Sequence, residues 1–244
     1  MKLLFIFTGV TIGSTCHENI ISTDEAKPKK ILEAYQKRFG IDFEYDIEEP
    51  YTELSENNTG EHIRMLTECV RTNIKRGFDG IIVTHGTDTL QYSAAAIGYS
   101  VGLDSIPVCI VSANRPIENE KSNALDNLHG AIELIKNGYG NGSFVVYRND
   151  GEKTTKIHRS TRLLAGKAFS DEVVSIYDSS YGYFDCNFNF IKNEEYEEKS
   201  DIINTLDFFN IRESSDNILV IPSYPGMSYP KLDKKTKYII HSKR

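Results

Sequence analysis

Short apolar runs alternate with segments of helical period along about the first 150 residues. The runs are bounded by glycine, asparagine or aspartate and read KLLFIF, IDFEYDI, GIIVTHG, IPVCIVSAN and GSFVVYRND. Among the segments between them, EHIRMLTECVRTNIKRG places Ile63, Leu66 and Val70 on one stripe, as in an amphipathic helix. Strands that alternate with helices in this way form βαβ units around a parallel sheet. The alternation predicts an α/β fold with a doubly wound, mostly parallel open sheet.

Three further segments are expected to be helices between these strands. They are AKPKKILEAYQKRFG, LQYSAAAIGYSV and NALDNLHGAIELIKNG. The first contains Gly40 where the helix should stop, because glycine readily adopts the backbone conformation that ends a helix.

Size and charge limit the possible partners. A chain of 244 residues with 39% hydrophobic content can bury one good core, or one core and part of a second. Its 28 basic and 35 acidic residues give a net charge of −7, and no basic stripe is present that could neutralise a run of phosphates. Nucleic acid is therefore not an expected partner.

The cysteines and histidines give no metal-binding pattern. The four cysteines lie far apart, at positions 16, 69, 109 and 186, without a CxxC pair. This spacing predicts reduced thiols and no structural metal. No cofactor is expected.

The N-terminus allows two interpretations. MKLLFIFTGVTIGSTC has one basic residue, a short apolar run and a cysteine after small residues, which loosely imitates a lipoprotein signal. LLFIF followed by Thr-Gly is an equally good buried first strand with a turn. No later stretch reaches the ~18 apolar residues that a membrane span requires, so no membrane partner is expected.

Small polar and acidic residues gather at three predicted strand ends, 8–11, 54–57 and 85–89. In an open parallel sheet the ligand binds beyond the carboxyl ends of the strands, where neighbouring loops converge. Helix capping is the alternative explanation for any one cluster. Three clusters at one sheet edge favour a site.

Several of these blocks carry a family resemblance. TGVTIG at 8–13, HGTDTL at 85–90 and TTKIH at 154–158 resemble the signature blocks of bacterial-type L-asparaginases, and are more similar to the cytoplasmic type I enzymes than to the periplasmic ones. ELSENNT at 53–59 and SANRP at 112–116 follow in the family order. The resemblance implies a flavodoxin-like N-terminal domain, a cytoplasmic location, L-asparagine as the small-molecule substrate with L-glutamine as the alternative, and a homo-oligomer if the C-terminal region permits.

The resemblance also assigns roles to individual residues. It implies that Thr11 is the primary nucleophile, attacking a side-chain amide carbonyl to release ammonia and leave an acyl-enzyme. Thr87, Asp88 and Lys156 would form a second catalytic triad, in which the lysine accepts a proton. The implied substrate-binding residues are Ser55, Glu56, Thr87 and Asp88.

Three other residues near these blocks are expected to have no catalytic role. His85 is interpreted as ordering its turn by hydrogen bonding, and Lys153 as a solvated charge. Tyr147 is expected to pack in the core.

The resemblance divides the chain into three parts. Residues 1–191 are expected to form the catalytic domain, 192–217 a polar, acidic linker, and 218–244 a remnant of a smaller second α/β domain. The remnant resembles the opening strand, loop and second strand of the family's C-terminal domain, which would be largely missing. Two strands are too few for an independent domain.

Other functions stay open at this point. Val10 stands where the family has a second glycine, Asn123 where it has aspartate, and no tyrosine lies between Thr11 and Tyr35. Val10, the missing tyrosine and the largely missing C-terminal domain favour a non-catalytic relative that binds an amino acid or a partner. TGVTIGST also resembles the TGxxxGxG turn of short-chain dehydrogenases, but no tyrosine is followed four residues later by lysine. The amidase subunit of archaeal tRNA amidotransferases is a further candidate, without support from the acidic charge balance.

Overall fold

The structure is a computed structural model that describes residues 1–9, 15–17, 20–22, 27–103, 105–167, 170–197 and 217–242. The chain divides into two compact units, residues 1–206 and 207–244. Thr11 lies outside the described residues.

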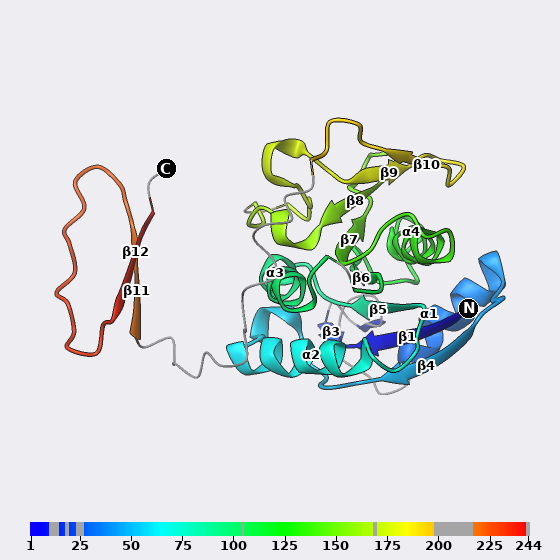
Figure 1. Ribbon diagram of the computed structural model, residues 1–244, viewed down its shortest axis with the longest axis horizontal. Helices are drawn as coiled ribbons and strands as arrows, with labels where there is room; N and C mark the ends of the chain where they lie inside the picture. The colour runs from blue at the N-terminus through cyan, green and yellow to red at the C-terminus, as the bar shows by residue number, and fades with distance from the viewer. Residues whose placement is uncertain are drawn as a thin grey trace. The chain divides into compact units, whose positions relative to one another are not determined.

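The first unit is built on a sheet that has eight strands among the described residues (Figure 1). Five of them are parallel, and they stand in the order β4 (Glu44–Glu48), β1 (Lys2–Phe7), β5 (Gly80–Thr84), β6 (Val108–Val111) and β7 (Ser143–Tyr147). Numbered along the chain, this is the order 2-1-3-4-5 of flavodoxin-like folds. The predicted α/β fold with a mostly parallel sheet is confirmed.

Three further strands extend the sheet beyond β7 with antiparallel pairing. These are β8 (Thr155–Arg159), β9 (Gly182–Phe184) and β10 (Phe190–Lys192). β8 runs back from the edge at which the parallel strands end, so it places Lys156 opposite Tyr147 at that edge.

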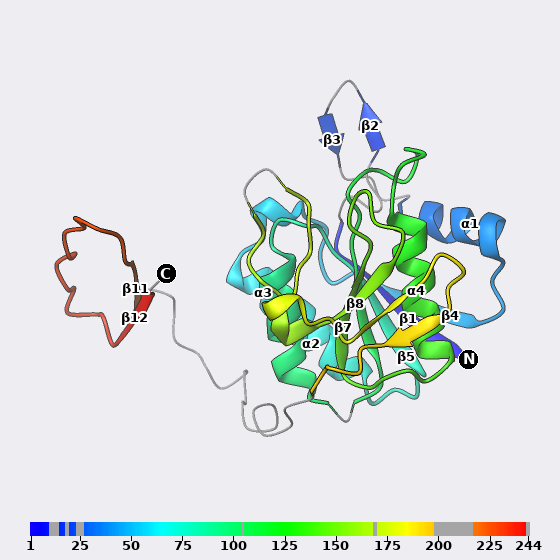
Figure 2. The same ribbon diagram turned by 90° about the horizontal axis from the view of Figure 1, so that it is seen from above.

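Four α-helices among the described residues cover the two faces of the sheet (Figure 2). α1 (Lys27–Phe39) and α4 (Ala124–Lys136) lie on one face, and α2 (Gly60–Asn73) and α3 (Leu90–Val101) on the other. Each face has its own buried apolar cluster. β1, β5, β6 and β7 are buried on both faces, which explains why these strands read as continuous apolar runs. No helix in the described part of the chain combines the length and apolar character that a bilayer crossing requires.

The second unit contains β11 (Ile218–Pro222) and β12 (Tyr238–Ser242), which pair in parallel. A separate short pair, β2 (Thr15–His17) and β3 (Ile20–Ser22), is antiparallel. The expected domain limits at residues 191 and 217 stay a prediction.

Candidate active site

The end of β1 is fixed by a glycine whose replacement would strain the backbone. Gly9 has a φ of +85°, and a Cβ atom there would lie 2.7 Å from Glu53 N and 2.8 Å from Thr52 Cα. Both are backbone atoms, which cannot move aside cheaply. Thr8 adds two hydrogen bonds, because its Oγ1 donates to Thr84 O at 2.8 Å and its carbonyl accepts from Glu53 N at 3.1 Å. The segment that carries Thr11 therefore starts from a fixed point.

Ser55 and Asp88 meet in the structure, although 33 residues separate them. Ser55 lies in the short 3-10 helix η2 (Ser55–Asn57), is buried, and donates from Oγ to Asp88 Oδ2 at 2.8 Å. Thr89 Oγ1 donates to Ser55 O at 2.9 Å, and Asn58 Nδ2 donates to Thr89 Oγ1 at 3.1 Å. Two predicted substrate-binding segments are thus joined by side-chain contacts. Glu56, from the same short helix, is exposed.

His85 is buried and uncharged between β5 and α3. Its ring nitrogen Nδ1 donates to Gly86 O at 2.8 Å, and Nε2 accepts from Asn58 Nδ2 at 3.4 Å. Burial lowers the pKa of His85, an effect that Asp88 opposes more weakly. These contacts fit the interpretation that His85 orders the turn.

Lys156 contacts two carboxylates that the sequence did not point to. Its Nζ donates to Glu152 Oε1 at 3.2 Å and lies 3.6 Å from Asp178 Oδ1. Asp178 and its neighbour Tyr177 have φ values of 51° and 58°, which are uncommon for residues other than glycine. Within the described residues, neither Thr87 nor Asp88 contacts the Lys156 ammonium. The triad of Thr87, Asp88 and Lys156 therefore stays a prediction.

A cavity of about 320 Å³ opens beside Thr87 and Asp88. Thr87, Asp88 and the first residues of α3 form one wall, and residues from 163–167 and 170–173 provide the other. Leu163, Leu164 and Val173 make the second wall partly apolar. The same wall carries Lys167, Asp171 and Glu172, of which Lys167 and Glu172 form an ion pair at 2.9 Å.

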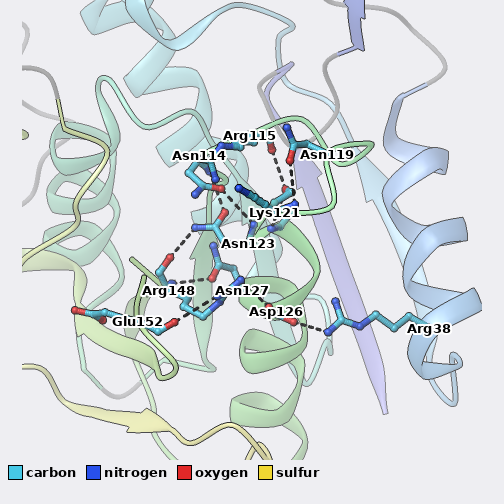
Figure 3. Close-up of polar contacts among 12 residues, drawn as sticks. Arg38, Asn114, Arg115, Asn119, Lys121, Asn123, Asp126, Asn127, Arg148 and Glu152 are labelled. Atoms are coloured by element: carbon cyan, nitrogen blue, oxygen red, sulfur yellow. Dashed lines mark hydrogen bonds and ion pairs between the residues drawn. The ribbon is translucent and has the colours of Figure 1, made fainter. Parts of the chain in front are cut away.

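Two buried asparagines hold the ends of β6 and β7 against the start of α4 (Figure 3). Asn127 Nδ2 donates to Ser112 O at 2.8 Å, and its Oδ1 accepts from Arg148 N at 2.8 Å. Asn123 Nδ2 donates to Arg148 O at 2.7 Å, and its Oδ1 accepts from Asn114 N at 2.9 Å. The two amides therefore lock adjacent strand ends in register.

Ion pairs extend this network across the edge of the sheet. Asp126 accepts from Arg148 and from Arg38 of α1, both at 2.9 Å (Figure 3). Arg148 Nη1 also donates to Glu152 O at 3.4 Å. In the sequence, Asn123 stands out only as a departure from the family, and nothing there marks Arg148. The signal available was the pair of amides four residues apart at the start of a predicted helix.

Metal ligands do not gather at this edge. Throughout the part of the chain that the structure describes, no group of three or more histidine, cysteine, aspartate or glutamate side chains is arranged to hold a metal ion. The described side chains at the site offer hydroxyls, amides, carboxylates and ammonium groups, which suit acid-base and nucleophilic chemistry on a polar organic substrate.

Most of the first unit matches a known protein family. Residues 2–176 match the family described as "Asparaginase, N-terminal". The matched segment covers more than half of the 244 residues.

Among curated proteins, similar sequences come from archaea. A glutamyl-tRNA(Gln) amidotransferase subunit from Pyrobaculum aerophilum is 30% identical over 125 residues, which make up 51% of this chain and 30% of that protein. The protein of the same name from Methanosphaera stadtmanae is 27% identical over 188 residues, or 74% of this chain and 41% of that protein. The chain therefore spans less than half the length of these two relatives.

Solved structures share the fold. The thermostable L-asparaginase from Thermococcus kodakarensis superposes with a TM-score of 0.71 at 23% identity, covering 93% of this chain and 65% of the other. A probable cytoplasmic L-asparaginase from Campylobacter jejuni gives 0.72 at 18% identity, covering 93% of this chain and 67% of the other. At such identities the likeness establishes the fold alone.

Proposed function

The chain belongs to the asparaginase family through its N-terminal domain, and from that membership we propose that it is an amidohydrolase that hydrolyses L-asparagine to L-aspartate and ammonia. The observation that carries the proposal is the Ser55–Asp88 hydrogen bond beside the cavity that Thr87 and Asp88 line. This hydrogen bond joins the Ser55 segment to the Asp88 segment, and both segments are proposed to bind the amino-acid end of the substrate.

The proposed reaction has two steps. The hydroxyl of Thr11 attacks the side-chain amide carbon, the C–N bond breaks, and ammonia leaves with the proton that the hydroxyl gave up. Water then attacks the resulting ester and releases aspartate. Thr87 and Lys156 pass protons in these steps, and Asp88 binds the α-ammonium of the substrate.

A coupled ammonia assay on the purified chain tests this function directly. Thr87→Ala is expected to lower kcat/KM by roughly 10²- to 10⁴-fold, the usual contribution of a positioned proton-transfer group, and Asp88→Asn is expected to lower kcat/KM by removing the charge that binds the substrate's α-ammonium. Thr72→Ala, on the exposed face of α2, is the matched control and should leave the rate unchanged. Wild-type activity in both site variants would rule out the assignment.

The names of the archaeal relatives favour a second candidate function, with glutamine as the substrate. Their shared name is that of a glutamyl-tRNA(Gln) amidotransferase component, so the second candidate is an amidase that supplies ammonia to a partner. Ammonia from glutamine but not from asparagine would favour this candidate. Binding of aspartate without ammonia from either amide would favour a non-catalytic relative.

We also propose a cytoplasmic location and a homo-oligomer. The location follows the Campylobacter jejuni structure named as a probable cytoplasmic enzyme. Sedimentation of the purified chain at several concentrations tests the oligomer.

A further inference from the structure

The residues at the ends of four adjacent strands form one polar row across the sheet. Tyr147 of β7 pairs directly with Lys156 of β8. The pairing of Val111 with Val146 places Ser112 beside Tyr147. The hydrogen bond from His85 N to Val111 O, at 2.9 Å, continues the ladder to β5. We call His85, Ser112, Tyr147 and Lys156 the edge row.

All four side chains belong to the face of the sheet that α3 covers. Val145 and Tyr147 belong to the apolar cluster of that face, whereas Val146 and Ile157 belong to the opposite cluster. Because side chains alternate along a strand, Lys156 shares the face of Tyr147. The same alternation gives Ser112 the face of Ile110, and His85 that of Val83.

Two hydroxyls in the edge row are buried without a partner. Ser112 and Tyr147 are both 0% exposed, and in the described part of the molecule neither hydroxyl makes a hydrogen bond. The amide of Asn123, whose Nδ2 donates one proton to Arg148 O, lies near enough to the Tyr147 hydroxyl to lower its pKa in opposition to burial, but the two groups do not reach hydrogen-bond geometry. Burial raises the pKa of Tyr147 to about 12, so the phenol keeps its proton at neutral pH. An unsatisfied buried hydroxyl costs stability, and such a group calls for an explanation in function.

The ammonium of Lys156, the residue opposite Tyr147, is bound by carboxylates rather than by the edge row. Lys156 is 24% exposed, and its ammonium contacts Glu152 and Asp178. Directly opposed side chains on one face of an antiparallel pair have Cβ atoms about 5 Å apart. Tyr147 and Lys156 are therefore direct neighbours on this face of the sheet.

We propose that the Tyr147 hydroxyl is the inner hydrogen-bond partner of Lys156, and that Tyr147 positions Lys156 for amide hydrolysis. The Lys156 ammonium then has two binding positions. In the outer station it contacts Glu152 and Asp178, and in the inner station it contacts the Tyr147 hydroxyl. It transfers protons from the inner station. Ser112 lies next in the edge row and supports the inner station. This inference rests on the proposed function.

Tyr147→Phe tests the inference because it removes only the unpartnered oxygen. We expect kcat for ammonia release to fall at least tenfold, KM to stay within a factor of two, and the melting temperature to stay equal or rise. Tyr181→Phe is the matched control, since the Tyr181 hydroxyl donates to Tyr139 O at 2.8 Å. It should show the opposite pattern, with a lower melting temperature and unchanged kcat.

Two more variants probe the two stations separately. Ser112→Ala should lower kcat severalfold without loss of stability. Glu152→Gln weakens the outer station and should raise kcat, by no more than about fivefold, because a partly exposed ion pair is worth little.

The possible failures are distinguishable. If the wild-type chain hydrolyses an amide and Tyr147→Phe keeps its kcat, the inference is wrong and the proposed function stands. If Tyr147→Phe lowers kcat only together with its melting temperature, the hydroxyl is structural and the inference is also wrong. A wild-type chain that releases no ammonia from asparagine or glutamine overturns the proposed function, and this inference with it.

Discussion

Asn127 shows how one buried side chain can fix a site to which it contributes no chemistry. Its amide bonds to Ser112 O and to Arg148 N, so it joins the ends of β6 and β7 at Ser112 of the edge row and at the residue that follows Tyr147. A serine or an aspartate could make one of these contacts, but only an amide both donates and accepts across this gap. The position thus depends on hydrogen-bond geometry, which the sequence spacing alone did not reveal.

Asn127→Ala should destabilise the fold strongly. The change leaves one carbonyl and one N–H group buried without partners, so we expect a loss of about 2 to 4 kcal/mol in the free energy of unfolding. Urea unfolding followed by circular dichroism measures it. Asn137→Ala is the control, because that amide donates to Glu133 O at the exposed end of α4. A loss as small as that of the control would contradict the role assigned to Asn127.

Ser55→Ala should weaken substrate binding more than turnover. Without the Ser55 hydroxyl, Asp88 loses the bond that orients its carboxylate. We expect KM for asparagine to rise about tenfold, equal to about 1.4 kcal/mol, with a smaller change in kcat. Steady-state kinetics beside Ser100→Ala, whose hydroxyl bonds within α3, provides the comparison. An unchanged KM would show that Asp88 is held in another way.

At the scale of elements, one histidine adds to the contact between α1 and α4, beside the Arg38–Asp126 ion pair. His129 of α4 bonds through Nδ1 to the Tyr35 hydroxyl at 2.8 Å. Its ring stacks on Phe39 at 4.0 Å and meets the edge of Phe188 at 4.3 Å. Burial lowers the pKa of His129, aided by Arg38 and opposed by Glu133 and Asp126. The ring is therefore neutral at pH 7 and accepts the tyrosine proton.

Acidification should loosen this contact. A histidine whose pKa is lowered by folding binds its proton more readily in the unfolded chain. Its contribution to stability is complete above the ordinary pKa of 6.5 and is lost as the pH falls through the folded value. Below pH 6.5, the free energy of unfolding of the wild-type chain should fall relative to that of His129→Phe by at most about 1.4 kcal/mol per pH unit. Parallel pH profiles of unfolding free energy for the two proteins would contradict this.

The parallel half of the sheet could be predicted from the sequence, and the antiparallel half could not. α3 covers the predicted segment LQYSAAAIGYSV from Leu90 to Val101. β9 and β10 have three residues each, too few to show a period of two, and their pairing depends on register with β8. At the site, motifs predicted Ser55 and Asp88, which meet. Of the two partners of Lys156, Glu152 lies in a loop and Asp178 in a single short 3-10 turn, and no local sequence pattern sets either conformation.

At the scale of the whole molecule, the first unit contains everything that the fold and the described site require. Every residue of the two buried apolar clusters lies within residues 1–206. In the second unit, Ile218, Val220 and Tyr238 are exposed. The two strands there form no comparable core among the described residues.

A chain ending at Leu206 should therefore keep its fold. We expect its melting temperature to stay within about 3 °C of that of the full chain, because a change of 1 kcal/mol shifts a protein of this size by about 2 to 4 °C. Differential scanning calorimetry of both chains checks this. A drop of ten degrees or more would show that residues 207–244 stabilise the first unit.

Gly9 has a consequence for experiments that read function from tolerance to substitution. Because Gly9, two residues before the proposed nucleophile in the sequence, has no side chain, its backbone can contact the backbone of Thr52 and Glu53. A saturation library scored by growth would reject every replacement there, alanine included, and rank the position beside the reactive threonines. Such a score would reflect the close backbone packing at this position, because glycine has no functional group that could take part in the reaction.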